Sequence, residues 1–217
     1  MNRARFSRIR AALIRRQPDL TVVMDQVHKS HNFSAILRNC DAVGVLEAHV
    51  VPPTHGLDLH HGTSAGTKKW VRVRRHDDVE QAVTHLQSQG FTVLAAHPSP
   101  AATDYRKVDF TRPTAIMMGA ELHGVSPEGL RSADAQVVLP MMGMVHSLNV
   151  SVATSLLLFE ALRQRQAAGM YDSSRLDPTV LKKTLFEWAY PTVAKARRAA
   201  DKPYPQLSED GDIVRGT

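Results

Sequence analysis

An alternation of short apolar runs with amphipathic segments is the feature that most constrains the fold of this 217-residue chain. Most runs precede a segment whose apolar residues recur at helical spacing. Strands that alternate with helices form parallel sheets, because the helix supplies the crossover. The sequence therefore predicts an α/β fold, a mainly parallel sheet covered by helices on both faces. The predicted strands are residues 20–24, 47–51, 71–73, 91–96, 114–118 and 137–139.

The N-terminal segment, residues 1–16, is strongly basic and precedes this alternation. On a helical wheel Phe6, Ile9 and Leu13 share one face, which predicts a docked helix. The opposite face is cationic, which is compatible with nucleic-acid binding and with an ordinary solvated surface. The basic residues assigned to that face are Arg5, Arg8, Arg15 and Arg16.

The C-terminal segment is also basic, with lysines and arginines around aromatic side chains. This composition predicts a helical extension that ends in a loose tail after about Pro205. We therefore expect three parts: a basic N-terminal helix (1–17), a central domain (18–169) and a basic helical C-terminal extension with its tail (170–217).

Composition narrows the class of protein. The net charge of +6 and a pI of about 9.7 favour a polyanionic partner such as RNA. Cys40 is the single cysteine, so the sequence provides neither a disulfide framework nor a CxxC site. No apolar run approaches the ~20 residues of a membrane span, and we expect a soluble cytoplasmic protein without a membrane partner. The sequence also lacks the GxGxxG, GxxxxGK[ST] and HExxH motifs.

A loop rich in glycine and histidine offers two weak motifs before the third predicted strand. Residues 62–66 match the GxSxG pattern of serine hydrolases, but that pattern requires an apolar strand before it and a packed helix after it. Adjacent His60 and His61 lack the spacing and the third ligand of a zinc site, so no metal is expected. The basic end of the loop, with Lys68 and Lys69, suits phosphate contacts, and an ordinary surface loop fits equally well.

Small and polar residues gather where predicted strands run into helices. Residues 137–166 combine an apolar run, a loop of Met and Gly residues and a helix that opens near Asn149. Asn32 is a suitable N-cap for the helix after the first strand, and Arg38 lies on the second turn of that helix. Ligands of open α/β sheets bind outside the carboxyl ends of the strands. Both segments are therefore candidates for a binding site with free helix N-terminal N–H groups.

Three segments, in this order, together resemble one family. They are residues 32–44 (NFSAILRNCDAVG), 118–124 (MGAELHG) and 139–153 (LPMMGMVHSLNVSVA). They look like the three motifs of the SPOUT-class RNA ribose 2′-O-methyltransferases, and in particular of the TrmH group. The resemblance runs from about Pro18 to Tyr171, and the terminal extensions are similar too.

The resemblance implies methylation of the ribose 2′-hydroxyl of guanosine-18 in the tRNA D-loop, with S-adenosyl-L-methionine as the methyl donor. It also implies a SPOUT fold whose C-terminal part forms a trefoil knot, in a protein that acts as a homodimer. The implied cofactor-binding residues are Ala96, Gly119, Leu139 and Leu148. The implied reaction-site residues are Asn32, Arg38, Glu121, Ser147 and Asn149.

The motifs also depart from the family pattern, at Ala120, at Leu122–His123 and at His146. These departures concern substrate range more than activity. Arg38 is implied to accept the hydroxyl proton, but a guanidinium is ordinarily always protonated, so a role as a clamp for a substrate phosphate stays open. Two alternatives to the main function remain. One is the same chemistry on ribosomal RNA or at another tRNA position, and the other is a non-catalytic RNA-binding protein of this fold.

Overall fold

The structure is a computed structural model that describes residues 2–53 and 69–214. The chain forms two compact units. One unit comprises Pro18–Met170, and the other combines the two ends of the chain, Met1–Gln17 and Tyr171–Thr217. The two basic terminal segments, which the sequence presents as separate parts, thus belong to one unit.

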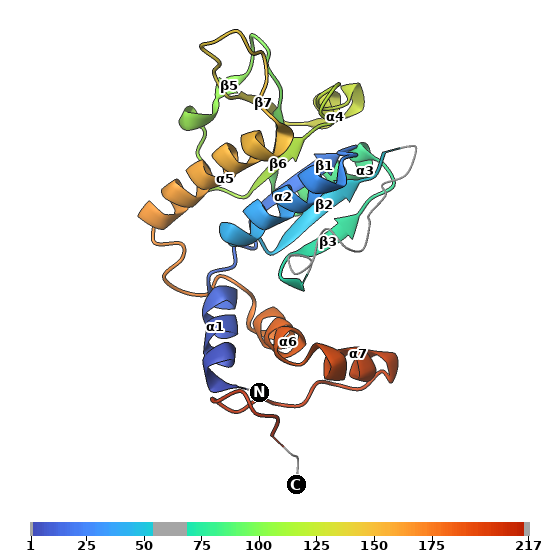
Figure 1. Ribbon diagram of the computed structural model, residues 1–217, viewed down its shortest axis with the longest axis vertical. Coiled ribbons are helices and arrows are strands. Elements are labelled where there is room, and N and C mark those ends of the chain that lie inside the picture. Colours follow the sequence, from blue (N-terminus) through green and yellow to red (C-terminus); the bar gives the residue numbers. More distant parts are fainter. Residues whose placement is uncertain (1, 54–68, 215–217) are drawn as a thin grey trace. The chain divides into compact units, whose positions relative to one another are not determined.

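The larger unit is built on a parallel sheet (Figure 1). Within the described residues this sheet has seven strands, in the order β3-β2-β1-β6-β4-β7-β5. Each neighbouring pair of strands is parallel. The predicted α/β fold is confirmed, although the short β5 has no counterpart among the predicted strands. The strands are β1 (Leu20–Asp25), β2 (Glu47–Val51), β3 (Arg72–Arg75), β4 (Thr92–Ala96), β5 (Thr103–Asp104), β6 (Thr114–Met118) and β7 (Ala135–Val138).

Helices cover both faces of this sheet, because successive strand residues point to opposite sides. On one face α2 packs against α5, over a core that includes Val22 and Met24 of β1 (Figure 1). On the other face α3 packs with α4 over a second core, which includes Val23. The helical elements of this unit are α2 (Ser30–Ala42), α3 (Val79–Ser88), η2 (Tyr105–Lys107), α4 (Pro127–Ser132) and α5 (Val150–Ala167).

Local capping signals set several helix ends. The Ser126 hydroxyl accepts a hydrogen bond from the Gly129 N–H at 3.1 Å, and Pro127 is the first residue of α4. Gly44 follows the C-cap of α2 with φ +85°, a conformation that glycine adopts without strain. Serine at the N-cap, proline at the first helical position and glycine after the C-cap are the residues that these positions favour.

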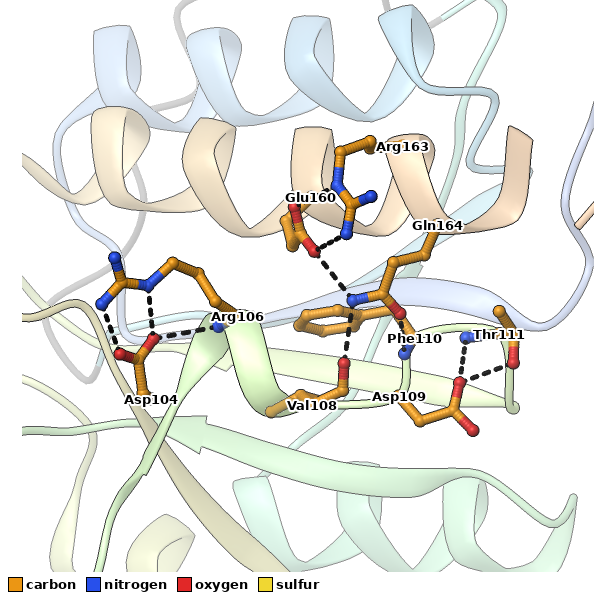
Figure 2. Close-up of polar contacts among 9 residues, drawn as sticks. All are labelled: Asp104, Arg106, Val108, Asp109, Phe110, Thr111, Glu160, Arg163 and Gln164. Carbon is orange, nitrogen blue, oxygen red and sulfur yellow. Dashed lines mark hydrogen bonds and ion pairs between the residues drawn. The ribbon is translucent and has the colours of Figure 1, made fainter. Parts of the chain in front are cut away.

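The C-terminal half of α5 is tied to the chain that leads from β5 to β6 (Figure 2). The Gln164 side chain bridges this connection: Nε2 donates to the Val108 carbonyl at 2.9 Å, and Oε1 accepts from the Phe110 N–H at 2.8 Å. Glu160 Oε1 accepts from the same Nε2 at 2.9 Å and also pairs with Arg163 at 2.7 Å. One amide side chain therefore satisfies both a backbone donor and a backbone acceptor of an irregular segment.

The next residue of α5, Arg165, is completely buried. Its Nε donates to the Phe110 carbonyl at 2.8 Å, and its Nη1 lies 2.6 Å from Asp19 Oδ1. Its Nη2 donates to the carbonyls of Asp19 and Arg112, each at 3.0 Å. Asp19 precedes β1 and Arg112 precedes β6, so this guanidinium joins α5 to the start of both central strands.

Three histidine rings pack together beside β2. His49 of β2 and His76, just after β3, are 3% and 6% exposed, and His49 Nδ1 lies 2.9 Å from His76 Nε2. The ring of His85 on α3 is 5.8 Å from that of His49 and 5.6 Å from that of His76. Burial lowers the pKa of His49 to about 4, against the attraction of Glu47, and also lowers the pKa of His76. The inner pair is therefore neutral at pH 7.

The smaller unit contains three helices in its described residues: α1 (Arg3–Ile14), α6 (Pro178–Ala189) and α7 (Pro191–Ala199). Asn2 caps α1 by accepting from the Ala4 N–H at 2.8 Å. α1 packs against α6, and its predicted apolar residues Phe6, Ile9 and Leu13 are buried. In the described part of the chain no helix is long and apolar enough to cross a membrane.

The C-terminal tail is ordered as far as Val214, so the expectation of a loose tail is wrong for these residues. Leu207 and Ile213 form a bridge, and the Tyr190 hydroxyl donates to the Gly211 carbonyl at 2.8 Å. Gly211 has φ +86°, and an added Cβ would lie 2.3 Å from Phe6 Cγ. This close approach of backbone to an aromatic ring holds the tail against α1.

Arg16 is also placed differently from the prediction. It lies beyond the end of α1, so the helical wheel does not describe its position. Its side chain is 2% exposed, and its guanidinium lies 5.0 Å from the centre of the Trp188 ring. The cation–π contact replaces an outward position, and Arg16 does not belong to the exposed cationic face.

Candidate active site

The candidate cofactor-binding residues lie at one edge of the sheet. Ala96 is the last residue of β4, and Gly119 and Leu139 directly follow β6 and β7. These three strands are neighbours in the order β6-β4-β7. Leu148 closes the loop that begins at Leu139 and lies just before α5. The carboxyl ends of adjacent parallel strands therefore bring Ala96, Gly119 and Leu139 to the same end of the sheet.

A tight hairpin shapes the segment after β6. The Ala120 N–H donates to the Gly124 carbonyl at 2.9 Å, and the Gly124 N–H donates back at 2.8 Å. A Cβ added to Gly119 would lie 1.9 Å from the Gly124 carbonyl carbon, so a larger residue would break the hairpin. Asp25 Oδ2, at the end of β1, accepts from the Ser126 N–H at 2.8 Å and anchors the far end of the hairpin. The absence of a side chain at position 119 is thus required by the backbone itself.

Three of the predicted reaction-site residues form one hydrogen-bonded chain. Asn32 Nδ2 donates to Glu121 Oε1 at 2.5 Å, and Asn149 Nδ2 donates to Asn32 Oδ1 at 3.2 Å. Asn149 Oδ1 in turn accepts from the N–H of Ser151 at 2.9 Å and from its hydroxyl at 2.7 Å. Residues from three segments that are remote in sequence therefore meet where β1 and β6 end.

The two asparagines have different roles at their helices. Asn149 is the N-cap of α5, as the sequence predicts. Asn32 is not an N-cap: α2 begins at Ser30 after Lys29, which makes no side-chain capping bond. The amide of Asn32 is 1% exposed in the first turn and is directed to Glu121 instead. This tertiary contact outweighs the local preference of asparagine for the cap.

The remaining two reaction-site candidates, Arg38 and Ser147, are exposed. Arg38 lies on α2, and Ser147 lies in the loop before α5. Within the described part of the chain neither joins the Asn32–Glu121–Asn149 chain of hydrogen bonds. Both side chains are therefore able to contact a ligand.

Two further residues belong to this edge of the sheet, and the sequence analysis did not select them. His28 Nδ1 lies 2.9 Å from Glu121 Oε2, within ion-pair distance. Asn39 Nδ2 donates to the Ser151 carbonyl at 2.9 Å and so links α2 to the first turn of α5. His28 follows the end of β1, and that position in an α/β sheet was a signal available in the sequence.

The candidate RNA-contacting residues are distributed unevenly. Arg5 and Arg8 are exposed on α1, and Arg15 is exposed at its C-cap. Lys69 is exposed as well, whereas Arg16 is buried as described above. Lys68, His60, His61 and the GxSxG segment lie outside the described residues. In residues 2–53 and 69–214 no group of three or more His, Cys, Asp or Glu side chains is arranged to hold a metal ion.

Comparisons with known proteins identify relatives of this chain. Two curated relatives are both named tRNA (guanosine(18)-2′-O)-methyltransferase. The relative from Escherichia coli is 49% identical over 98% of this chain and 94% of its own length. The relative from Thermus thermophilus is 55% identical over 85% of this chain and 95% of its own length.

A solved structure and two family models extend the comparison. The crystal structure of the TrmH/SpoU tRNA modifying enzyme from A. aeolicus matches with a TM-score of 0.81 and 42% identity, over 88% of this chain and 97% of that chain. Residues 163–216 match the model of the C-terminal segment of SpoU rRNA methylases. Residues 19–159, which hold the whole sheet, match the model of the SpoU rRNA methylase family. The chain belongs to the SpoU rRNA methylase family.

Proposed function

We propose that this chain transfers a methyl group from S-adenosyl-L-methionine to the ribose 2′-hydroxyl of guanosine-18 in tRNA. The names of the relatives above support this substrate. The observation that carries the proposal is the chain of hydrogen bonds from Asn149 through Asn32 to Glu121, at the carboxyl ends of β1 and β6. It unites the three motifs at the place where an α/β sheet binds its ligands.

The strand ends suit a cofactor that is held through backbone groups. Gly119 is buried and admits no side chain, so backbone is what this position offers to a ligand. Ala96, Gly119, Leu139 and Leu148 would hold S-adenosyl-L-methionine, which supplies a methyl group already activated on a sulfonium. No side chain of this set is ionisable, so these residues would orient the ligand by shape and by backbone N–H and C=O groups.

The residues around the strand ends then serve the acceptor. Methyl transfer to a hydroxyl is an in-line displacement, and correct alignment accounts for much of the rate. Asn32, Glu121 and Asn149 fix the loops on which alignment depends. Arg38 is exposed on α2 and is therefore available to a substrate phosphate or to the 2′-oxygen. Ser147 adds a hydroxyl at the start of α5.

We further propose that the protein is a homodimer. Val152, Leu156 and Phe159 form an apolar stripe on α5 and are 48%, 41% and 47% exposed. Their i, i+4, i+7 spacing is that of a helix face that packs against a partner, and a second copy of the chain would cover it. The family resemblance also implies a trefoil knot in the C-terminal part of the larger unit. A tRNA substrate implies a cytoplasmic location.

A methylation assay with defined RNAs tests the function. Purified protein is incubated with labelled S-adenosyl-L-methionine and a tRNA transcript, and the product is located by nuclease digestion and mass spectrometry. We expect one 2′-O-methylguanosine, at position 18. A matched transcript with 2′-deoxyguanosine at that position should accept no label, because the acceptor hydroxyl is missing. Label on that control, or on ribosomal RNA alone, would contradict the proposal.

A further inference from the structure

His28 occupies the connection between β1 and α2, on the side of the sheet where the reaction-site residues meet. Its side chain is 41% exposed, and the residue before it, Val27, is fully buried. The buried neighbour fixes the backbone here, so the position of the imidazole is set by the core although the ring itself borders solvent.

Glu121 faces both this connection and the helix after it. Oε1 accepts from Asn32, whereas Oε2 is buried, has no hydrogen-bond partner among the described residues and lies within ion-pair distance of His28 Nδ1, at 2.9 Å. The Glu121 side chain is only 11% exposed. A carboxylate can only accept hydrogen bonds, so the imidazole nitrogen that faces Oε2 is placed to act as its donor.

The carboxylate also sets the direction of the whole chain of hydrogen bonds. Because Glu121 only accepts, the Asn32 amide must present its NH₂ to it and its oxygen to Asn149. Asn149 must then present its NH₂ to Asn32, which leaves its oxygen for the cap of α5 at Ser151. Rotation of the Glu121 carboxylate would therefore disturb both asparagines.

We propose that His28 is a positioning residue for methyl transfer, an inference that rests on the proposed function. Its Nδ1–H holds the Glu121 carboxylate in the orientation that fixes Asn32 and Asn149 at the reaction site. The imidazole is 41% exposed, so water can take its place beside Glu121 when it is removed, and its role is in the geometry of the site and not in the stability of the fold.

Substitutions at His28 separate these roles. His28→Asn places an amide NH₂ close to the position of Nδ1, whereas His28→Leu has a similar size and no donor. With saturating tRNA and methyl donor, we expect His28→Leu to lower the single-turnover rate by about 10- to 100-fold and His28→Asn to stay within about 3-fold of wild type. Affinity for tRNA should be unchanged in both, and Tm should shift by less than about 3 °C.

A double-mutant cycle with Glu121→Gln tests the route of the effect. If His28 acts through the carboxylate, His28→Leu should slow the Glu121→Gln protein little further, because the two changes remove the same interaction. Additive losses would overturn the inference. So would wild-type rates in His28→Leu, equal losses in His28→Asn and His28→Leu, or weaker tRNA binding with an unchanged rate. A wild-type protein that does not methylate guanosine-18 would refute the proposed function, and the inference with it.

Discussion

The two ends of α5 carry polar clusters of opposite character. At the C-terminal end, Arg165 is fully buried, and its guanidinium donates to three carbonyls and the Asp19 carboxylate. At the N-terminal end, Asn149 is exposed and links to buried Asn32, near exposed Arg38. The first cluster has its hydrogen-bonding capacity used internally. The second keeps donors and acceptors at the surface.

The two polar clusters assign stability to one end of α5 and function to the other. A buried polar group whose partners are all within the chain contributes to the uniqueness and rigidity of the fold, and removal of one member leaves the others unpaired. A cluster with exposed members at the strand ends is available to a ligand. Substitutions at the C-terminal end should therefore change stability, and those at the N-terminal end should change activity.

The largest expected effect is a loss of activity from a substitution near the N-terminal end of α5. Arg38→Ala should lower the methylation rate by roughly 10²- to 10⁴-fold, because it removes the group proposed to serve the acceptor hydroxyl or its phosphate. The affinity for S-adenosyl-L-methionine, measured by calorimetry, should be nearly unchanged. Tm should also be unchanged, since the side chain is exposed. Wild-type turnover in this variant would remove Arg38 from the site.

At the C-terminal end of α5, a substitution should change the free energy of unfolding. Arg165→Met should lower the free energy of unfolding by roughly 3–5 kcal/mol, because it leaves the Asp19 carboxylate and three carbonyls without their buried donor. Urea denaturation measures the change. Arg163→Ala is the matched control: its guanidinium is 67% exposed and pairs with Glu160, so the loss should be within about 1 kcal/mol. Equal losses in the two variants would break the comparison.

The pair of histidines beside β2, His49 and His76, is also buried and internally paired, and its effect on stability can be tested by changing the pH. Burial lowers the pKa of His49 from its usual 6.5 to about 4 in the folded chain, so as the pH falls the unfolded chain binds the proton first. The contribution of His49 to the free energy of unfolding is therefore full above pH 6.5. It falls by roughly 3 kcal/mol as the pH is lowered to 4. Unfolding free energies over this range should fall more steeply in the wild type than in His49→Gln. Parallel curves would show that His49 does not carry the dependence.

Asn149 has both a structural role, as the N-cap of α5, and a proposed role in activity, through its bond to Asn32. Two substitutions separate these roles. Asn149→Ala removes the cap of α5 and the bond to Asn32, and should cost about 1 kcal/mol of stability as well as activity. Asn149→Asp keeps an oxygen for the Ser151 N–H but has no NH₂ for Asn32. We expect it to retain the Tm and to lose activity. An active Asn149→Asp protein would show that the cap alone matters.

The smallest expected effect separates exposed from buried arginines in the smaller unit. Arg15→Gln should lower the log–log salt slope of tRNA binding by about 0.7–0.9 if Arg15 makes one phosphate contact. Arg16→Gln should leave that slope unchanged and instead lower Tm, since Arg16 is 2% exposed over Trp188. Filter binding at several salt concentrations measures both slopes. The opposite result would place Arg16 on the RNA-facing side.

Elements with strong local signals were predictable from the sequence. The predicted strand 114–118 coincides with β6, and Asn149 caps the helix that was expected to open near it. The two-residue β5 was missed because so short a strand has no period. The sequence motifs identified Asn32, Glu121 and Asn149 as reaction-site residues. That assignment came from the family resemblance and not from hydrophobic periodicity. The role of Asn32 inside α2, and the contact of His28 with Glu121, depend on residues that are distant in sequence, so local patterns could not reveal them.

The closure of the tail on α1 has a consequence for biosynthesis. α1 leaves the ribosome before the larger unit, whereas its partners α6 and Gly211 are translated after that unit. The larger unit, Pro18–Met170, is complete before them and can fold as synthesis proceeds. During that interval Phe6, Ile9 and Leu13 have no α6 to cover them. A chain that terminates prematurely within its last helices would therefore carry an unburied, basic N-terminal helix, and quality-control proteases would recognise that product by its exposed apolar face.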